Sequence, residues 1–92
     1  MTLKIEKIAT ERGTVIRLIG RLRREHLGVL TKQIESCMDE ITLDLDELAL
    51  ISLEGVRFLI ACQGRGIAVA NASPYITDWM RRERMPKDDN LC

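Results

Sequence analysis

The fold is decided by residues 43–60, LDLDELALISLEGVRFLI. The first part alternates apolar and acidic residues, and this period of two predicts a strand over residues 41–45. From residue 53 onward, apolar residues recur every three or four positions, which predicts a helix to residue 63. Ser52 is the expected N-cap of that helix. Ligands and partners of α/β proteins commonly bind where a strand hands over to a helix, so the residues around Ser52 form the first candidate site.

Upstream of this stretch, the pattern predicts a hairpin followed by a helix. Residues 3–8 and 14–19 read as two strands, and the turn over residues 11–13 contains a glycine, so the strands should be antiparallel. Apolar residues at helical spacing then predict a helix over residues 24–38.

Downstream, a short strand is predicted over residues 67–71, and Gly64 is the expected left-handed cap of the helix before it. Ser73 and Pro74 are an N-cap and a first-turn residue, so a last helix should begin there and end near Glu83.

The element order β-β-α-β-α-β-α predicts an α/β fold with a four-stranded mixed sheet. The first strand is antiparallel and the others are parallel, in the sequential order 1-2-3-4. Right-handed crossovers then place the helices mainly on one face. Thr42 and Asp44 point away from the apolar residues of their strand, so the other face should be partly open. The expected domain spans residues 1–83, and residues 84–92 form a flexible tail.

Composition narrows the class of function. Lys and Arg number 14, Asp and Glu also number 14, and this zero net charge argues against a nucleic-acid binder. The arginines at 21–24 and 81–84 are therefore expected to be solvated. No apolar run approaches 20 residues and the N-terminus lacks a hydrophobic signal core, so a cytoplasmic location without membrane insertion is the default expectation.

Groups with chemical reactivity are sparse. The three cysteines show no CxxC spacing, which disfavours a disulfide framework or a zinc site, and Cys37 and Cys62 should be buried on helices. His26 is the only histidine, and the chain has no phosphate-binding glycine loop and no GxSxG motif. Asp44, Asp46 and Glu47 lack a second set of ligands for magnesium. We therefore expect no catalytic residue, no metal site and no cofactor. The single tryptophan, Trp79, is expected to anchor the core.

This layout, with the segment SLEGV at residues 52–56, resembles the STAS domain. That family includes the cytoplasmic domains of sulphate transporters and the bacterial anti-sigma factor antagonists. In the antagonists, the matching stretch is Asp-Ser-Ser-Gly or Asp-Ser-Thr-Gly before an apolar helix. The second hydroxyl residue is phosphorylated there by a kinase that is also the anti-sigma factor. The resemblance covers roughly residues 3–83 and is specific in layout and in the glycine.

The chain departs from the family in the hydroxyl motif. Ser52 stands where the family has Asp, Leu53 where it has the first Ser, and Glu54 where it has the phosphoacceptor, while Gly55 matches. Glu54 cannot be phosphorylated. Its carboxylate either imitates part of the charge of a phosphate permanently or simply suits the first turn of a helix.

The resemblance implies a non-catalytic, regulatory protein-interaction domain. Its surface would combine the junction with the adjacent part of the first strand–helix connection. The residues expected to bind the partner are Asp46, Glu47, Ser52, Leu53, Glu54, Gly55 and Arg57. The partner would be an anti-sigma factor or serine kinase-like protein, or an ATPase subunit of a lipid-transport system.

Two alternatives stay open. A nucleotide or lipid sensor would use the open sheet face around Thr42, Asp44, Ala68 and Ala70. A homodimer would form through the open sheet face or an edge, although Lys4 and Glu6 on the first strand discourage edge pairing.

Overall fold

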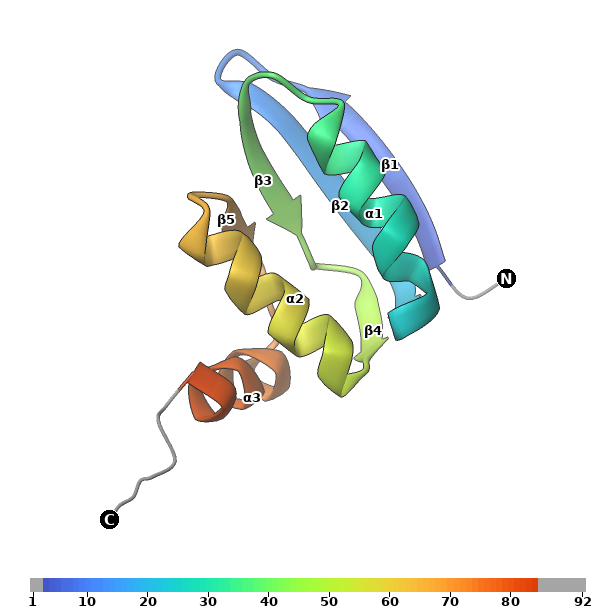
Figure 1. Cartoon of the computed structure of the whole chain (residues 1–92), viewed down its shortest axis with the longest axis vertical. Coiled ribbons are helices and arrows are strands. Elements are labelled where there is room, and N and C mark those ends of the chain that lie inside the picture. Colours follow the sequence, from blue (N-terminus) through green and yellow to red (C-terminus); the bar gives the residue numbers. More distant parts are fainter. Residues whose placement is uncertain (1–2, 85–92) are drawn as a thin grey trace.

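The computed structural model describes residues 3–84 (Figure 1). Of the predicted tail, residues 84–92, the structure describes only Arg84, which is the last residue of a helix; residues 85–92 lie outside the described residues. The elements in chain order are β1 (Leu3–Ala9), β2 (Gly13–Leu22), the 3₁₀ turn η1 (Arg24–His26), α1 (Leu27–Glu35), β3 (Glu40–Asp44), β4 (Leu48–Ile51), α2 (Leu53–Gly64), β5 (Ala68–Ala70) and α3 (Pro74–Arg84).

The sheet is mixed, as predicted, but it has five strands and not four. β1 pairs antiparallel with β2, and β2, β3 and β5 continue in parallel order. The fifth strand, β4, pairs parallel with the last part of β2, where Gly20 is opposite Leu48 and Leu22 is opposite Ile51. β2 has ten residues, so its far end extends past β3 and leaves backbone groups for β4 to pair with.

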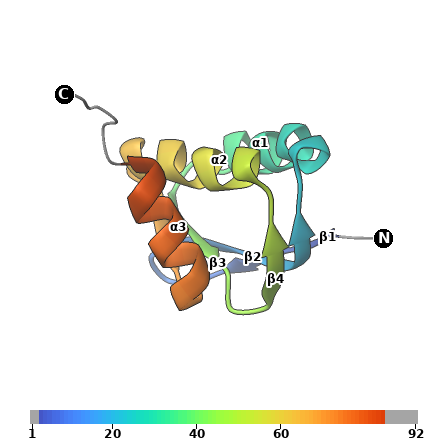
Figure 2. The ribbon, with the colours of Figure 1, turned by 90° about the horizontal axis from the view of Figure 1, so that it is seen from below.

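α1 and α2 lie over one face of the sheet, which confirms the predicted arrangement of the helices (Figure 2). α3 packs against α2 near β5 (Figure 1). Between the layers lies one core that includes Ile16, Leu18, Leu43 and Leu59, each with no exposed surface. Full burial of a side chain of this size contributes about 1.5–3 kcal/mol to folding. Trp79 is half-buried against this core, in agreement with its predicted role.

The predicted helix over residues 24–38 is wrong at both ends. It begins as the 3₁₀ turn η1, in which His26 Nδ1 accepts a hydrogen bond from the backbone N–H of Arg23 at 3.0 Å. α1 ends at Glu35, where the Ser36 hydroxyl donates to the carbonyl of Gln33 at 2.8 Å. A serine side chain that bonds back to the preceding turn competes with the continuation of the helix.

Two further predictions need correction at the ends of helices. Cys62 is buried on α2 as expected, but Cys37 follows the end of α1 and is only half-buried. The left-handed residue after α2 is Gly66, with φ of 88°, and not Gly64, because the helix is closed by Arg65. No helix within residues 3–84 is long and apolar enough to cross a membrane.

Candidate functional site at the start of α2

Ser52 connects the start of α2 to the end of β2. Its backbone N–H donates to the carbonyl of Leu22 at 2.9 Å, and its side-chain Oγ accepts from the backbone N–H of Gly55 at 3.1 Å. The second bond confirms Ser52 as the N-cap of α2. This cap satisfies one of the helix N–H groups that have no partner within the helix. The first turn of α2 is therefore held in a fixed position against the sheet.

Gly55 lets the first turn of α2 approach the sheet closely. A Cβ on this residue would lie 2.7 Å from Cγ1 of Ile51 and 3.4 Å from Cδ2 of Leu22. Real Cβ atoms do not come that close to another side chain, so only glycine fits without movement of Ile51. The φ of Gly55 is not positive, so a left-handed backbone is not the reason for glycine here. The reason is the close packing against Ile51.

A shallow groove of about 450 Å³ lies at the ends of β2 and β4, beside the first turn of α2. Three segments line it: the end of β2 with the η1 turn, the end of β4, and the start of α2. The lining residues are Arg21, Leu22, Arg23, Arg24, Glu25, Leu50, Ile51, Ser52 and Glu54. The structure thus brings the first strand–helix connection and the junction together, as the predicted surface requires.

The charge of the groove comes from exposed side chains. Arg21, Arg23 and Arg24 are exposed, and none of them forms an ion pair with a carboxylate within residues 3–84. Glu54 is also exposed, in the first turn of α2, where the helix dipole favours negative charge. The groove therefore presents three arginines beside two carboxylates.

Leu50 gives the groove an exposed apolar side chain. It lies opposite Arg21 in the β2–β4 register and is 49% exposed, whereas its neighbour Ile51 is only 6% exposed. An exposed leucine between charged groups is a surface that another protein can bury.

The predicted partner-binding residues separate into three places. Ser52 and Glu54 line the groove, Leu53 is half-buried next to them, and Gly55 is buried beneath. Arg57 lies on the exposed side of α2 and pairs with Glu83 of α3, with Nε 3.3 Å from Oε1.

Asp46 and Glu47 lie in the turn between β3 and β4, on the side of the sheet opposite α1 and α2 (Figure 2). Neither residue lines the groove. Glu47 is 3.9 Å from the guanidinium of Arg17, and the backbone N–H of Asp46 donates to Oδ1 of Asp44 at 3.0 Å.

The open sheet face carries a cluster of charges around Arg17. Its guanidinium lies 3.6 Å from Asp44, 3.9 Å from Glu47 and 4.0 Å from Glu6. The hydrogen bond from the Asp46 backbone lowers the pKa of Asp44, and the Asn71 amide, 3.1 Å away, and Arg17 lower it further. These contacts leave Asp44 partnered by Arg17, Asn71 and the backbone of Asp46 on the open face.

The prediction of the site named only Ser52 and Glu54 among the residues that line the groove. The other seven were missed, namely Arg21, Leu22, Arg23, Arg24, Glu25, Leu50 and Ile51. The sequence shows these arginines as a cluster. Their position beside Ser52 depends on the pairing of β4 with the end of β2, which the sequence does not reveal. The signal for Leu50 is the apolar run at 48–51. As a strand, this run buries Leu48 and Ile51 and leaves Ala49 and Leu50 exposed.

Comparison with known proteins identifies the fold. A crystal structure of an uncharacterized DUF3478-family protein from Shewanella loihica PV-4, described as having a SpoIIAA-like fold, is similar to this chain with a TM-score of 0.54. The two share 18% identity, and the match covers 89% of this chain and 76% of that chain. The fold is SpoIIAA-like. The predicted STAS-like architecture is therefore confirmed, because this is the fold of the anti-sigma factor antagonists that the chain resembles.

No family model matches the chain, and no curated protein matches it. The likeness to the SpoIIAA-like fold is one of architecture, so a role of the groove depends on the residues that line it.

Proposed function

We propose that this SpoIIAA-like chain is a non-catalytic regulatory domain that binds a protein partner through the groove at the start of α2. The observation that carries the proposal is the position of three arginines, none of them ion-paired within residues 3–84, and one exposed leucine beside Ser52 and Glu54. Arginines and an apolar anchor are typical of protein interfaces. The groove is also shallow, which suits a protein surface better than an enclosed small molecule.

In this proposal Glu54 replaces a regulated charge with a permanent one. In the sequence resemblance to the STAS domain, Glu54 stands where the anti-sigma factor antagonists have their phosphoacceptor. Its side chain is exposed in the first turn of α2. A carboxylate carries about half the charge of a phosphate and one oxygen fewer, so the domain would have a fixed binding state. A serine kinase-like anti-sigma factor is the expected class of partner, and an ATPase subunit of a lipid-transport system is the second.

Affinity purification from the source cell tests this proposal. Wild type should recover a partner that Glu54→Arg loses, because the substitution reverses the charge at the centre of the surface. Glu11→Arg is the matched control, since Glu11 is exposed in the β1–β2 turn at the other end of the sheet. Equal recovery by all three proteins would show that the groove is not the interface. A thermal shift with nucleotides or fatty acids, without any recovered protein, would favour a ligand sensor.

A further inference from the structure

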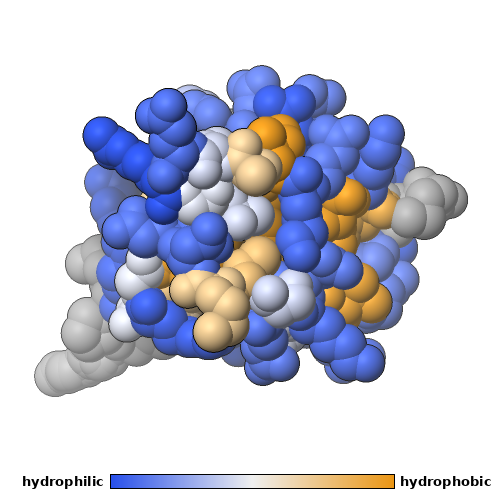
Figure 3. All heavy atoms as spheres, turned by 90° about the horizontal axis from the view of Figure 1, so that it is seen from above, coloured by the Kyte–Doolittle hydropathy of each residue, from blue (hydrophilic) through white to orange (hydrophobic). Residues whose placement is uncertain are grey.

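A second surface lies at the other end of the sheet from the groove. A hollow of about 760 Å³ opens between the β1–β2 turn and the ends of α1 and α2, and its lining includes Cys37, Met38 and Ile67. Seen from above, this end of the molecule shows a broken hydrophobic area among hydrophilic side chains (Figure 3). Ile67 is buried and Cys37 is half-buried, whereas Met38 is 97% exposed.

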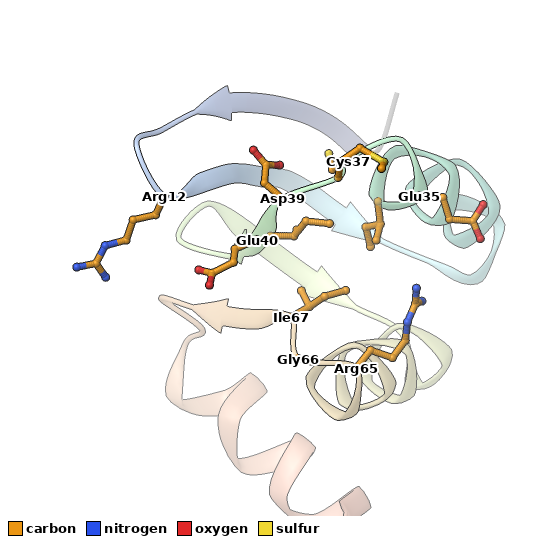
Figure 4. A pocket seen from close by; sticks show the side chains of 11 residues that line it. Arg12, Glu35, Cys37, Asp39, Glu40, Arg65, Gly66 and Ile67 are labelled. Atoms are coloured by element: carbon orange, nitrogen blue, oxygen red, sulfur yellow. The ribbon is translucent and has the colours of Figure 1, made fainter.

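Two arginines and three carboxylates flank the hollow. Arg12, Asp39 and Glu40 lie toward one side, and Glu35 and Arg65 lie toward the other, with Cys37 between the two sides (Figure 4). All five charged side chains are exposed, and none forms an ion pair within residues 3–84. Most other arginines of the described chain that lie outside the groove, such as Arg17 and Arg57, do have a carboxylate partner.

This arrangement is complementary to itself. If a second copy is related to the first by a two-fold axis through the middle of the hollow, the axis exchanges the two sides. Arg12 of one copy then meets Glu35 of the second copy, and Arg65 meets Glu40. Because an isologous contact repeats each pair, both kinds of ion pair form twice.

Met38 supplies an apolar contact for the same dimer. It lines the hollow and is 97% exposed, so in each copy its side chain is available to pack across the contact. A methionine is flexible enough to fill an irregular hollow, and burying an almost fully exposed side chain favours association.

We propose that a second copy of this chain binds at the hollow, in a two-fold dimer held by Arg12–Glu35 and Arg65–Glu40 pairs. The dimer leaves both grooves at the start of α2 free, because hollow and groove lie at opposite ends of β2. The dimer therefore presents two copies of the groove. Its formation does not depend on whether the groove binds a partner. It also differs from pairing through the open sheet face or a sheet edge.

Sedimentation velocity of the full chain tests the dimer. Wild type should shift from monomer toward dimer between about 10 μM and 1 mM, a range expected for a small interface with exposed ion pairs. Higher salt should weaken the association by screening those pairs. Arg65→Glu should lower the association constant by about tenfold or more, because it turns two attractions into two repulsions.

Charge exchange separates this contact from any other mode of association. Glu40→Arg combined with Arg65→Glu should restore dimerisation, and Arg12→Glu with Glu35→Arg is a second, independent exchange. Arg23→Glu with Arg24→Glu, in the groove, is the matched control and should leave association unchanged. The proposal is overturned if wild type stays monomeric throughout, if Arg65→Glu associates like wild type, or if neither exchange restores what a single reversal loses.

Discussion

Gly55 and Ile51 are packed so closely that a Cβ on Gly55 would lie 2.7 Å from Cγ1 of Ile51. This contact joins the first turn of α2 to β4 and so fixes one wall of the groove. Gly55, the residue that matches the STAS motif, is thus explained in this chain by steric fit alone. This explanation holds whatever the role of residues 52–54.

Gly55→Ala should therefore destabilise the fold by about 1–3 kcal/mol, the usual cost of adding an atom to a well-packed site. Urea unfolding followed by circular dichroism measures the change. Gly64→Ala is the matched control in the same helix, because a Cβ there meets nothing within 4 Å. It should be neutral or stabilising by up to about 1 kcal/mol. Equal effects of the two substitutions would contradict the packing argument.

Ser52→Ala should cost about 1 kcal/mol of unfolding free energy, because the N–H of Gly55 loses the acceptor that caps α2. Ser52→Asp should keep most of the stability, since aspartate caps a helix about as well as serine does. The same unfolding experiment measures both variants. A loss of stability in Ser52→Asp as large as in Ser52→Ala would argue against the cap.

Protonation of Asp44 should lower the unfolding free energy of the protein in acid. The pKa of Asp44 lies below the ordinary value of 3.8 in the folded state, so the charged form stabilises the fold. That contribution is complete above the unfolded pKa and is lost as pH falls through 3.8 and then through the lower folded pKa. Asp44→Asn should thus flatten the dependence of unfolding free energy on pH below about 5.

Asn71→Gly tests the cause of the lowered pKa of Asp44. It removes the amide donor 3.1 Å from the carboxylate but tolerates the positive φ of 60° at this position. The acid slope should shrink only in part, because the backbone of Asp46 still donates to Asp44. A slope identical to wild type in both variants would mean that Asp44 does not carry the acid sensitivity.

The pair between Arg57 and Glu83 should contribute little to stability. Nε of Arg57 lies 3.3 Å from Oε1 of Glu83, but the arginine side chain is 60% exposed and solvent screens the attraction. A double-mutant cycle with Arg57→Gln and Glu83→Gln should give a coupling of about 0.2–1 kcal/mol. A coupling of several kcal/mol would show that this pair is needed to hold α3 on α2.

Much of the fold could be predicted because it rests on local signals. The period-two pattern of residues 41–45 became β3, the first two strands form the expected antiparallel hairpin, and Ser52 and Ser73 cap their helices. Each of these elements is specified by residues within a few positions of one another. The tertiary contacts of the fold agree with these local patterns, so the predicted elements formed.

The missed features depend on contacts that are distant in the sequence. Residues 48–51 become a strand only because β2 extends beyond β3, and no local pattern distinguishes them from an apolar connection. The same strand brings Leu50 beside Arg21 and so completes the groove. For this reason the sequence could locate Ser52 and Glu54, but not the arginines opposite them.

Photo-crosslinking at Leu50 tests the central claim, that a protein partner binds in the groove. A photoreactive amino acid is placed at residue 50 in the source cell, and at Val29 as a control, because Val29 is 56% exposed on α1 and does not line the groove. We expect a discrete crosslinked protein from position 50, none from position 29, and loss of the product in a Glu54→Arg background. No product at 50, or the same product at both positions, would contradict the account.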